Sequence, residues 1–296
     1  MGNKYKLTKE SIEVDGHTLY RIVALKDFGT VKKGEKGGFI ENENNLSQEG
    51  DCWVYGNAKV FELALVSGSA KVKDLAEVRE DAVVTCRSVI HEKAKVYGGA
   101  NVRDNVEILS FAKVYGNARV YDDSIISGCA EVYENAEVSG EAVVFGDAKV
   151  YGSAYVSGFS ELSDNAKVYG GAKVLGHAEI FEYAEVFEFA TVDGAKIRGS
   201  AVVKGRAKVY GHITIKGTSV ISNDSDYIVF KNWWSSGRYF TWTRSNNMWS
   251  VGCFYGDGDE LIEKAYKHSE LSGREYGRAV KYVREILEDE KSKVEK

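Results

Sequence analysis

A six-residue rhythm of apolar and polar positions runs through most of this chain. Four positions after each aliphatic residue comes a small residue, most often alanine, and two positions after it glycine or an acidic residue is common. The aliphatic series returns at every sixth position without a gap, and it comprises Val54, Val60, Val66, Val72, Val78, Val84, Ile90, Val96, Val102, Ile108, Val114, Val120, Ile126, Val132, Val138, Val144, Val150, Val156, Leu162, Val168, Val174, Ile180, Val186 and Val192.

A period of six matches neither an α-helix, with 3.6 residues per turn, nor a plain strand, with a period of two. Short strands must therefore alternate with tight corners, where Gly, Asn and Asp tolerate a left-handed backbone. Three such segments close a triangular coil, and successive coils stack about 4.8 Å apart through parallel ladders. The pattern predicts a single-stranded left-handed parallel β-helix with a mainly β fold.

The repeat slips once and then continues to a clear end. Ala190 is followed by a small residue at Ala195, one position early, and the shifted frame runs from Ile197 to Ile221. Counted backwards from Ala58, the small-residue phase continues through Cys52 and Leu46 to Ile40. We therefore predict a β-helix over 40–222, with about ten coils and an axis of about 48 Å.

Equivalent positions on successive coils are 18 residues apart, so the outward columns can be read from the sequence. One face carries an aromatic column beside a mixed column of lysine and glutamate, which includes Lys113 and Glu131. Such rings stack and such charges pair, which stabilises the coil. Alternatively, the strip is a flat protein-docking surface. The candidate interface residues are Tyr97, Tyr115, Tyr133, Tyr151, Tyr169 and Phe187.

A second face is apolar in patches, and it offers either a self-association surface or a seat for a terminal domain. Its apolar residues are Trp53, Val89, Leu109, Ile125, Val143, Phe145 and Phe181.

Open ends of a solenoid expose ladder edges, so both ends need caps. Residues 1–39 alternate as a hairpin around Asp15-Gly16, which favours a type I′ turn and predicts an N-terminal β cap. The segment from Lys32 to Gly38 is basic and rich in glycine, but it lacks the spacing of a phosphate-binding loop. We expect a plain loop there.

The six-residue rhythm stops after Ile221, and residues 223–296 have the composition of a separate small α+β domain. Tyr227–Trp234, Arg238–Thr243 and Met248–Tyr255 are expected to form a three-stranded antiparallel sheet. Two amphipathic helices should follow at about 259–268 and 273–290.

Four of the five tryptophans lie in this C-terminal domain, with basic residues between them. Some rings are expected to form its core, whereas others could form an aromatic and basic pocket for a nucleotide or a short nucleic acid. The candidate ligand-binding residues are Lys231, Trp233, Trp234, Arg238, Trp242 and Arg244.

Composition and charge narrow the classes of function. The net charge of −5 gives no general attraction to double-stranded DNA or to anionic lipid, and no apolar run is long enough to cross a bilayer. Four scattered cysteines without a CxxC pair are typical of free thiols, so we expect a cytoplasmic protein of a bacterial host.

No catalytic constellation, metal site or cofactor motif is evident in the sequence. His91, His177 and His212 lie alone on β-helix coils, and no inserted loop supports any of them as a base. A three-histidine zinc site would need them close together, but His91 and His177 are nearly five coils apart. The sequence predicts no catalytic residues, no metal ligands and no cofactor.

The aliphatic and small positions of the repeat resemble the hexapeptide-repeat family, whose members fold as left-handed β-helices and include acyltransferases, γ-class carbonic anhydrases and structural proteins. Repeats of the form Ala-Lys-Val-Tyr-Gly-Asn, flanked by caps, are also similar to uncharacterised proteins of bacteriophages and prophages. These resemblances imply a homo-oligomer and a non-catalytic protein that binds and neutralises a host component, either a defence protein or a nucleotide signal. A hexapeptide-type acyltransferase and a structural self-assembling subunit are the alternatives.

Overall fold

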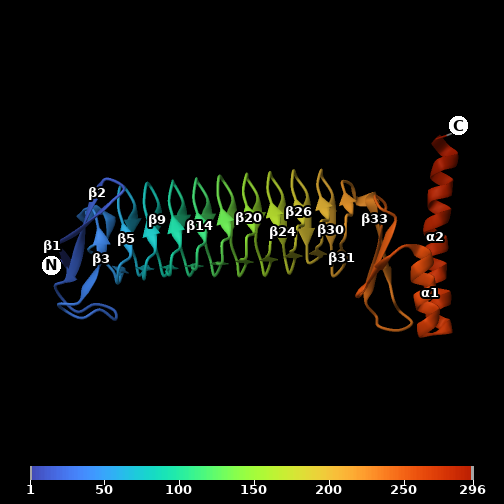
Figure 1. Cartoon of the computed structure of the whole chain (residues 1–296), viewed down its shortest axis with the longest axis horizontal. Coiled ribbons are helices and arrows are strands. Elements are labelled where there is room, and N and C mark those ends of the chain that lie inside the picture. The colour runs from blue at the N-terminus through green and yellow to red at the C-terminus, as the bar shows by residue number, and fades with distance from the viewer. Residues whose placement is uncertain (1, 295–296) are drawn as a thin grey trace.

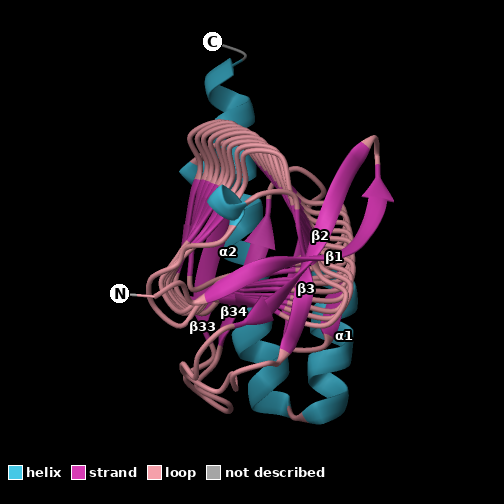
Figure 2. Ribbon diagram, turned by 90° about the vertical axis from the view of Figure 1, so that its left-hand side faces the viewer, coloured by secondary structure: helices cyan, strands magenta, loops and turns pink. Residues whose placement is uncertain are grey.

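The computed structural model describes residues 2–294 and shows a long rod with a cap at each end (Figure 1). A β-hairpin covers the N-terminal end, stacked coils form the shaft, and a small domain with two helices lies across the other end. Viewed along the rod, the coils superpose as one triangular outline with the hairpin in front of it (Figure 2). The fold is mainly β and has the predicted β-helix as its main part.

Three parallel sheets form three faces of the shaft, and most of their strands are two residues long. The first face contains β5 (Lys59–Val60), β8 (Glu77–Val78), β11 (Lys95–Val96), β14 (Lys113–Val114), β17 (Glu131–Val132), β20 (Lys149–Val150), β23 (Lys167–Val168), β26 (Glu185–Val186), β29 (Val202–Val203) and β32 (Val220–Ile221). The second face contains β4 (Trp53–Val54), β7 (Lys71–Val72), β10 (Val89–Ile90), β13 (Glu107–Ile108), β16 (Ile125–Ile126), β19 (Val143–Val144), β22 (Glu161–Leu162), β25 (Glu179–Ile180), β28 (Lys196–Ile197) and β31 (Thr214–Ile215). The third face contains β6 (Leu65–Val66), β9 (Val83–Val84), β12 (Asn101–Val102), β15 (Arg119–Val120), β18 (Glu137–Val138), β21 (Tyr155–Val156), β24 (Lys173–Leu175), β27 (Thr191–Asp193) and β30 (Lys208–Tyr210).

The repeat positions fill the inside of the shaft. The aliphatic series from Val54 to Val192 is fully buried, as are the small residues that alternate with it. Strands pair in register one coil apart, so that Val114 lies beside Val132. Each coil therefore buries the edge of its neighbour, which explains why a period of six residues is sufficient to specify the fold.

The corners explain why glycine or an acidic residue stands two positions after most of the aliphatic residues, with Cys86 and Ser110 as exceptions. These residues have a left-handed backbone, as at Gly116 (φ +69°) and Glu134 (φ +59°). A Cβ added to Gly116 would lie 2.8 Å from the backbone nitrogen of Glu134 on the next coil. Where the residue is acidic, its carboxylate accepts a hydrogen bond from the next coil, as Glu134 does from the Gly152 amide at 2.8 Å.

The predicted one-residue slip lies at the corner around Gly194 and does not interrupt the stack. Ala195 is fully buried in the small-residue position. On all three faces the strands on either side of the slip pair at a spacing of 17 residues, as Glu179 does with Lys196, whereas coils before and after it pair at 18. The deleted residue is absorbed at a corner, where the backbone is least constrained by pairing.

The N-terminal cap contains the predicted hairpin of β1 (Tyr5–Val14) and β2 (His17–Ala24). Asp15 (φ +52°) and Gly16 (φ +88°) both have positive φ, as a type I′ turn requires. Strand β2 pairs antiparallel with β3 (Lys36–Ile40), which in turn pairs parallel with β5. The expectation of a plain loop from Lys32 to Gly38 is therefore wrong from Lys36 onward, because these residues begin the first face. A short 3-10 helix, η1 (Glu43–Asn45), follows.

Lys4 closes the N-terminal end of the core. It is 1 % exposed, and its Nζ donates to the carbonyl oxygens of Glu49 (3.3 Å), Gly50 (3.3 Å) and Cys52 (3.1 Å). Carbonyl groups at the first coil have no preceding coil to pair with, so a buried ammonium group satisfies them.

The C-terminal domain has a four-stranded antiparallel sheet instead of the three strands expected. After η2 (Asp224–Asp226) come β33 (Tyr227–Lys231), β34 (Tyr239–Thr243), β35 (Met248–Val251) and β36 (Phe254–Gly256), and then α1 (Gly258–His268) and α2 (Glu270–Val294). The expected strand over Met248–Tyr255 is split because Gly252 (φ +54°) makes a two-residue hairpin turn.

This domain is anchored to the end of the shaft by hydrogen bonds. Thr241 Oγ1 donates to the Thr214 carbonyl at 2.7 Å, and the buried Lys216 Nζ donates to the Gly252 carbonyl at 3.2 Å. The sheet of the domain thus covers the last coil, and its other side faces the two helices.

Candidate ligand site in the C-terminal domain

Two of the four tryptophans of the domain fill its core. Trp242 is fully buried and Trp249 is 1 % exposed, and both pack with Phe240 between the sheet and the helices. The indole Nε1 of Trp242 donates to Asn247 Oδ1 at 2.8 Å. The structure thus places Trp242 inside the domain, where its ring stabilises the packing of sheet on helix.

Arg244 lies against the same core from outside. Its guanidinium group is 5.7 Å from the centre of the Trp242 ring and forms an ion pair with Glu290 on α2. That carboxylate, which hydrogen-bonds the guanidinium group, raises the pKa of Arg244 above its usual value. Arg244 therefore ties α2 to the sheet.

The other two tryptophans border a shallow groove of about 290 Å³ with Lys231, Arg278 and Tyr282. Trp233 is 68 % exposed. Trp234 packs edge-on against Tyr276, with ring centres 4.9 Å apart, and its buried Nε1 has no partner among the described residues. Of the six candidate residues, only Lys231, Trp233 and Trp234 share this groove.

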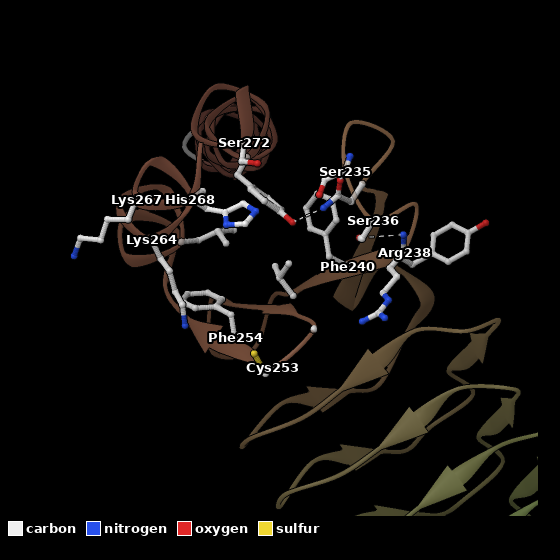
Figure 3. Close-up of a pocket in the computed structure, with 17 residues that line it drawn as sticks. Ser235, Ser236, Arg238, Phe240, Cys253, Phe254, Lys264, Lys267, His268 and Ser272 are labelled. Carbon is white, nitrogen blue, oxygen red and sulfur yellow. Dashed lines mark hydrogen bonds between the residues drawn. The ribbon is translucent and has the colours of Figure 1, made fainter. Parts of the chain in front are cut away.

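Arg238 lines a different and larger cavity, of about 690 Å³, between the sheet and the helices (Figure 3). This volume is within the range of about 300–1,000 Å³ that small-molecule sites usually have. Its apolar wall comprises Phe240, Val251, Phe254, Leu261, Ala265 and Tyr276. Such a wall would hold the apolar part of a ligand away from water.

Four basic side chains line this cavity. Arg238 contributes from the start of β34, and Lys264, Lys267 and His268 contribute from α1. Among the described residues, none that lines the cavity is acidic. The cavity therefore combines an apolar interior with a positively charged rim, which suits an anion with an apolar portion.

Hydrogen bonds fix the loop that carries Arg238. The Asn232 side chain accepts from the Ser235 amide at 3.0 Å, and its Nδ2 donates to the Tyr276 hydroxyl at 2.8 Å. Burial raises the pKa of Tyr276, so this hydroxyl stays neutral. Gly237 (φ +67°) completes the turn, and its amide donates to the Asn232 carbonyl at 2.7 Å.

Sequence reasoning found Arg238 but missed the cations of α1. Lys267 and His268 both lie one helical turn after Lys264, and the three residues flank the buried positions Leu261 and Ala265. That arrangement was a usable signal, because it predicts a basic strip along the boundary of the buried face.

The aromatic column of the first face forms a continuous stack in the structure. Successive rings from Tyr97 to Phe187 are 4.8–4.9 Å apart and nearly parallel. The neighbouring charges pair along the axis, as Lys113 does with Glu131 at 3.0 Å. The expected stacking and pairing are confirmed, whereas a role as a docking surface stays a prediction.

The apolar patches of the second face lie partly under the N-terminal cap. Trp53 is fully buried and contacts Tyr5 and Phe28 of the cap. Val89, Leu109, Ile125, Val143, Phe145 and Phe181 are half-buried. Self-association through this face stays a prediction.

The β-helix histidines lie apart from one another. His91 Nε2 is 2.9 Å from Glu107 Oε1, and His177 stacks on Phe159 with ring centres 4.8 Å apart. His212 is exposed. Within residues 2–294, no three His, Cys, Asp or Glu side chains lie close enough together to hold a metal ion. No described helix is both long and apolar enough to span a membrane.

The six-residue period, the three stacked parallel sheets and the buried aliphatic and alanine ladders define a hexapeptide-repeat left-handed β-helix protein. No family model matches the chain. Over 78 residues the chain is 40 % identical to a protein described as an uncharacterised acetyltransferase, YdcK, of Escherichia coli strain K12. The match covers 23 % of this chain and 24 % of YdcK, so it spans about a quarter of that relative.

Proposed function

We propose that this protein is a non-catalytic binding protein whose C-terminal domain holds a small anionic ligand in the cavity between the sheet and the two helices. The observation that carries the proposal is the lining of that cavity: an apolar wall, four basic residues and no acidic residue among those described. A binding role also accounts for the form of the molecule, because the shaft presents the domain at the end of a rod.

The contacts within the cavity fit binding better than covalent chemistry. Cys253 and His268 both line it, but among the described residues no hydrogen bond joins them. In Figure 3 they lie on different walls. A thiol nucleophile needs a base within hydrogen-bond reach, and this pair does not provide one.

Cys253 makes the proposal directly testable. It is an exposed thiol that lines the cavity, whereas Cys86 and Cys129 are exposed thiols on the shaft. The rates of alkylation by N-ethylmaleimide, measured at each cysteine by mass spectrometry, therefore include an internal control. Adenosine monophosphate and octanoate are suitable anionic probes, with adenosine and octanol as their neutral counterparts.

We expect at least one anion to slow the alkylation of Cys253 several-fold while Cys86 and Cys129 react at unchanged rates. The neutral counterpart should protect less, because the basic rim contributes only to binding of the charged form. If no anion in a panel of carboxylates and phosphates changes the rate at Cys253, the proposal is wrong.

The sequence-based hypothesis that the protein neutralises a host component is a narrower form of this proposal. In one form of this hypothesis, the small-molecule version, the ligand is a nucleotide signal. Binding by the protein would then remove that signal from the cell. The protein version requires a docking surface, for which the ring stack of the first face is the candidate. Protection by a nucleotide in preference to octanoate would support the small-molecule version.

An acetyltransferase is the second candidate, and one contact favours it. The His91 ring and the Glu107 carboxylate are hydrogen-bonded, an arrangement that orients a histidine as a general base. The similarity of part of the chain to YdcK, which is described as an uncharacterised acetyltransferase, points the same way. Acetyl-CoA should then bind at the second face, and His91→Gln should abolish acetyl transfer without changing the affinity for acetyl-CoA. Absence of acetyl-CoA binding would exclude this candidate.

A further inference from the structure

Two cations of the C-terminal cavity have no carboxylate partner and no hydrogen-bond acceptor for their charged groups among the described residues. They are Arg238 and Lys264. Lys267, which also lines the cavity, is paired with Glu263 at 2.6 Å, and Arg278 of the neighbouring groove is paired with Glu275 at 2.6 Å. Arg238 and Lys264 are therefore the two lining cations that an anion can bind without displacing a carboxylate.

These two cations come from opposite walls. Arg238 lies beside Ser235 and Ser236 at the edge of the sheet, whereas Lys264 extends from α1 along the ring of Phe254 (Figure 3). The His268 ring points into the cavity from the same helix, and the Lys267 side chain points away from it. The positive charge thus has two poles, one on each wall.

Apolar side chains separate the two poles. In Figure 3, Phe240 and Phe254 lie between Arg238 and Lys264, and Val251 also lines the cavity. A sphere of the same volume as the cavity would be about 11 Å across, so one small molecule can contact both walls. A ligand with a single charge would leave one pole unpaired.

We propose that the ligand of this cavity carries two anionic groups, one at each end of an apolar or planar body, and that Arg238 and Lys264 each bind one of them. This inference rests on the proposed binding function and specifies its ligand class. Arg238 presents the planar fork that suits a carboxylate or phosphate, and Lys264 presents a point charge whose stem packs on Phe254. Dicarboxylates and bisphosphates share this chemistry.

The test compares anions that differ only in a second carboxylate or phosphate group; those with one such group are called monoanions and those with two are called dianions, whatever the charge on each phosphate. One arm uses straight-chain dicarboxylates of six to twelve carbons against the matching monocarboxylates. The other uses adenosine 3′,5′-bisphosphate against adenosine monophosphate. The readout is the anion concentration that half-protects Cys253 from alkylation, with Cys86 and Cys129 as internal controls.

In one of the two arms, we expect the dianion to half-protect Cys253 at a concentration about tenfold lower than the matching monoanion. A tenfold change is what one additional charge-assisted hydrogen bond contributes to the affinity. Arg238→Ala and Lys264→Ala should each remove this advantage. Arg278→Ala removes a cation that lies outside this cavity, so it is the charge-matched control and should retain the advantage. The arm that shows the advantage identifies the ligand as a dicarboxylate or a bisphosphate.

The outcomes separate the inference from the binding function on which it rests. If monoanions protect Cys253 and dianions protect it no better, binding stands and the two-pole inference is overturned. It is equally overturned if Arg238→Ala leaves the dianion advantage intact. If no anion protects Cys253 in the native protein, both proposals fall. Circular dichroism and the alkylation rates at Cys86 and Cys129 confirm that each variant is folded.

Discussion

The left-handed corners make a sharp prediction at Asp122, which lies at a corner with φ +61°. Its Oδ2 accepts a hydrogen bond from the Gly140 amide of the next coil at 3.0 Å. Replacing Asp122 by alanine removes this bond and keeps a β-carbon in a backbone conformation that disfavours it. Replacement by glycine also removes the bond but relieves the conformational cost.

The magnitudes follow from these two contributions. The exposed hydrogen bond is worth about 0.5–1.5 kcal/mol, and an ordinary residue in the left-handed region costs about 1–2 kcal/mol, less for aspartate and asparagine. Glycine avoids this conformational cost, but it also makes the unfolded chain more flexible. The extra entropy lost on folding costs about 0.5–1 kcal/mol. We expect Asp122→Ala to destabilise by about 1–2 kcal/mol, Asp122→Gly by less than about 1 kcal/mol, and Asp122→Asn hardly at all.

Asp123 is the matched control, because it is the next residue, is also exposed and lies outside the left-handed region. Its carboxylate accepts from the Asn105 side chain at 2.8 Å. At this position glycine should be less stable than alanine by about 0.5–1 kcal/mol. The order of glycine and alanine should therefore reverse between two adjacent residues.

Urea unfolding followed by far-ultraviolet circular dichroism measures these differences as shifts in midpoint at constant slope. Fluorescence is unsuitable, because all five tryptophans lie near the two ends of the rod. If Asp122→Ala is as stable as Asp122→Gly, or if both positions show the same order, the account of the corners is refuted.

Four further outcomes test other parts of the structure. Burial raises the pKa of the five stacked tyrosines of the first face, which favours their neutral form in the folded chain. Their stabilising effect should thus be complete below about pH 10 and be lost as the pH rises further, with tyrosinate absorbance appearing together with loss of circular dichroism. Lys4→Met should destabilise the N-terminal cap by about 1–3 kcal/mol by leaving buried carbonyl groups unpaired, measurable as faster amide exchange in the first coils. Trp242→Phe should loosen the C-terminal domain by a similar amount, seen as a lower thermal midpoint, because it opens a cavity and removes the bond to Asn247. Glu131→Gln should cost less than about 1 kcal/mol in urea unfolding, and the loss should shrink with added salt, because its lysine partners are partly exposed.

The shaft was predictable because its information is local and repeated. Each coil needs an aliphatic, a small and a corner residue at the same positions. A variant residue such as Ser88 or Val106 therefore does not obscure the pattern, because the neighbouring coils keep it. Even the slip before Ala195 is visible, because the frame resumes and runs on for several more repeats.

The cavity could not be predicted in the same way. Arg238 and Lys264 lie 26 positions apart in the sequence, and only the packing of α1 on the sheet brings them to one cavity. The clustering of tryptophan and arginine residues in the sequence predicted a pocket lined by these residues themselves. In a domain this small, however, large rings are needed as core, and Trp242 and Trp249 are used in that way.

The in-register stacking of the coils has a consequence for the dimensions of the molecule. Insertion or deletion of a complete 18-residue coil would change the distance between the two caps by about 4.8 Å and leave every column of side chains aligned. The shaft thus sets the separation between the hairpin and the C-terminal domain in steps of one coil, and that separation can be changed without redesigning either of them.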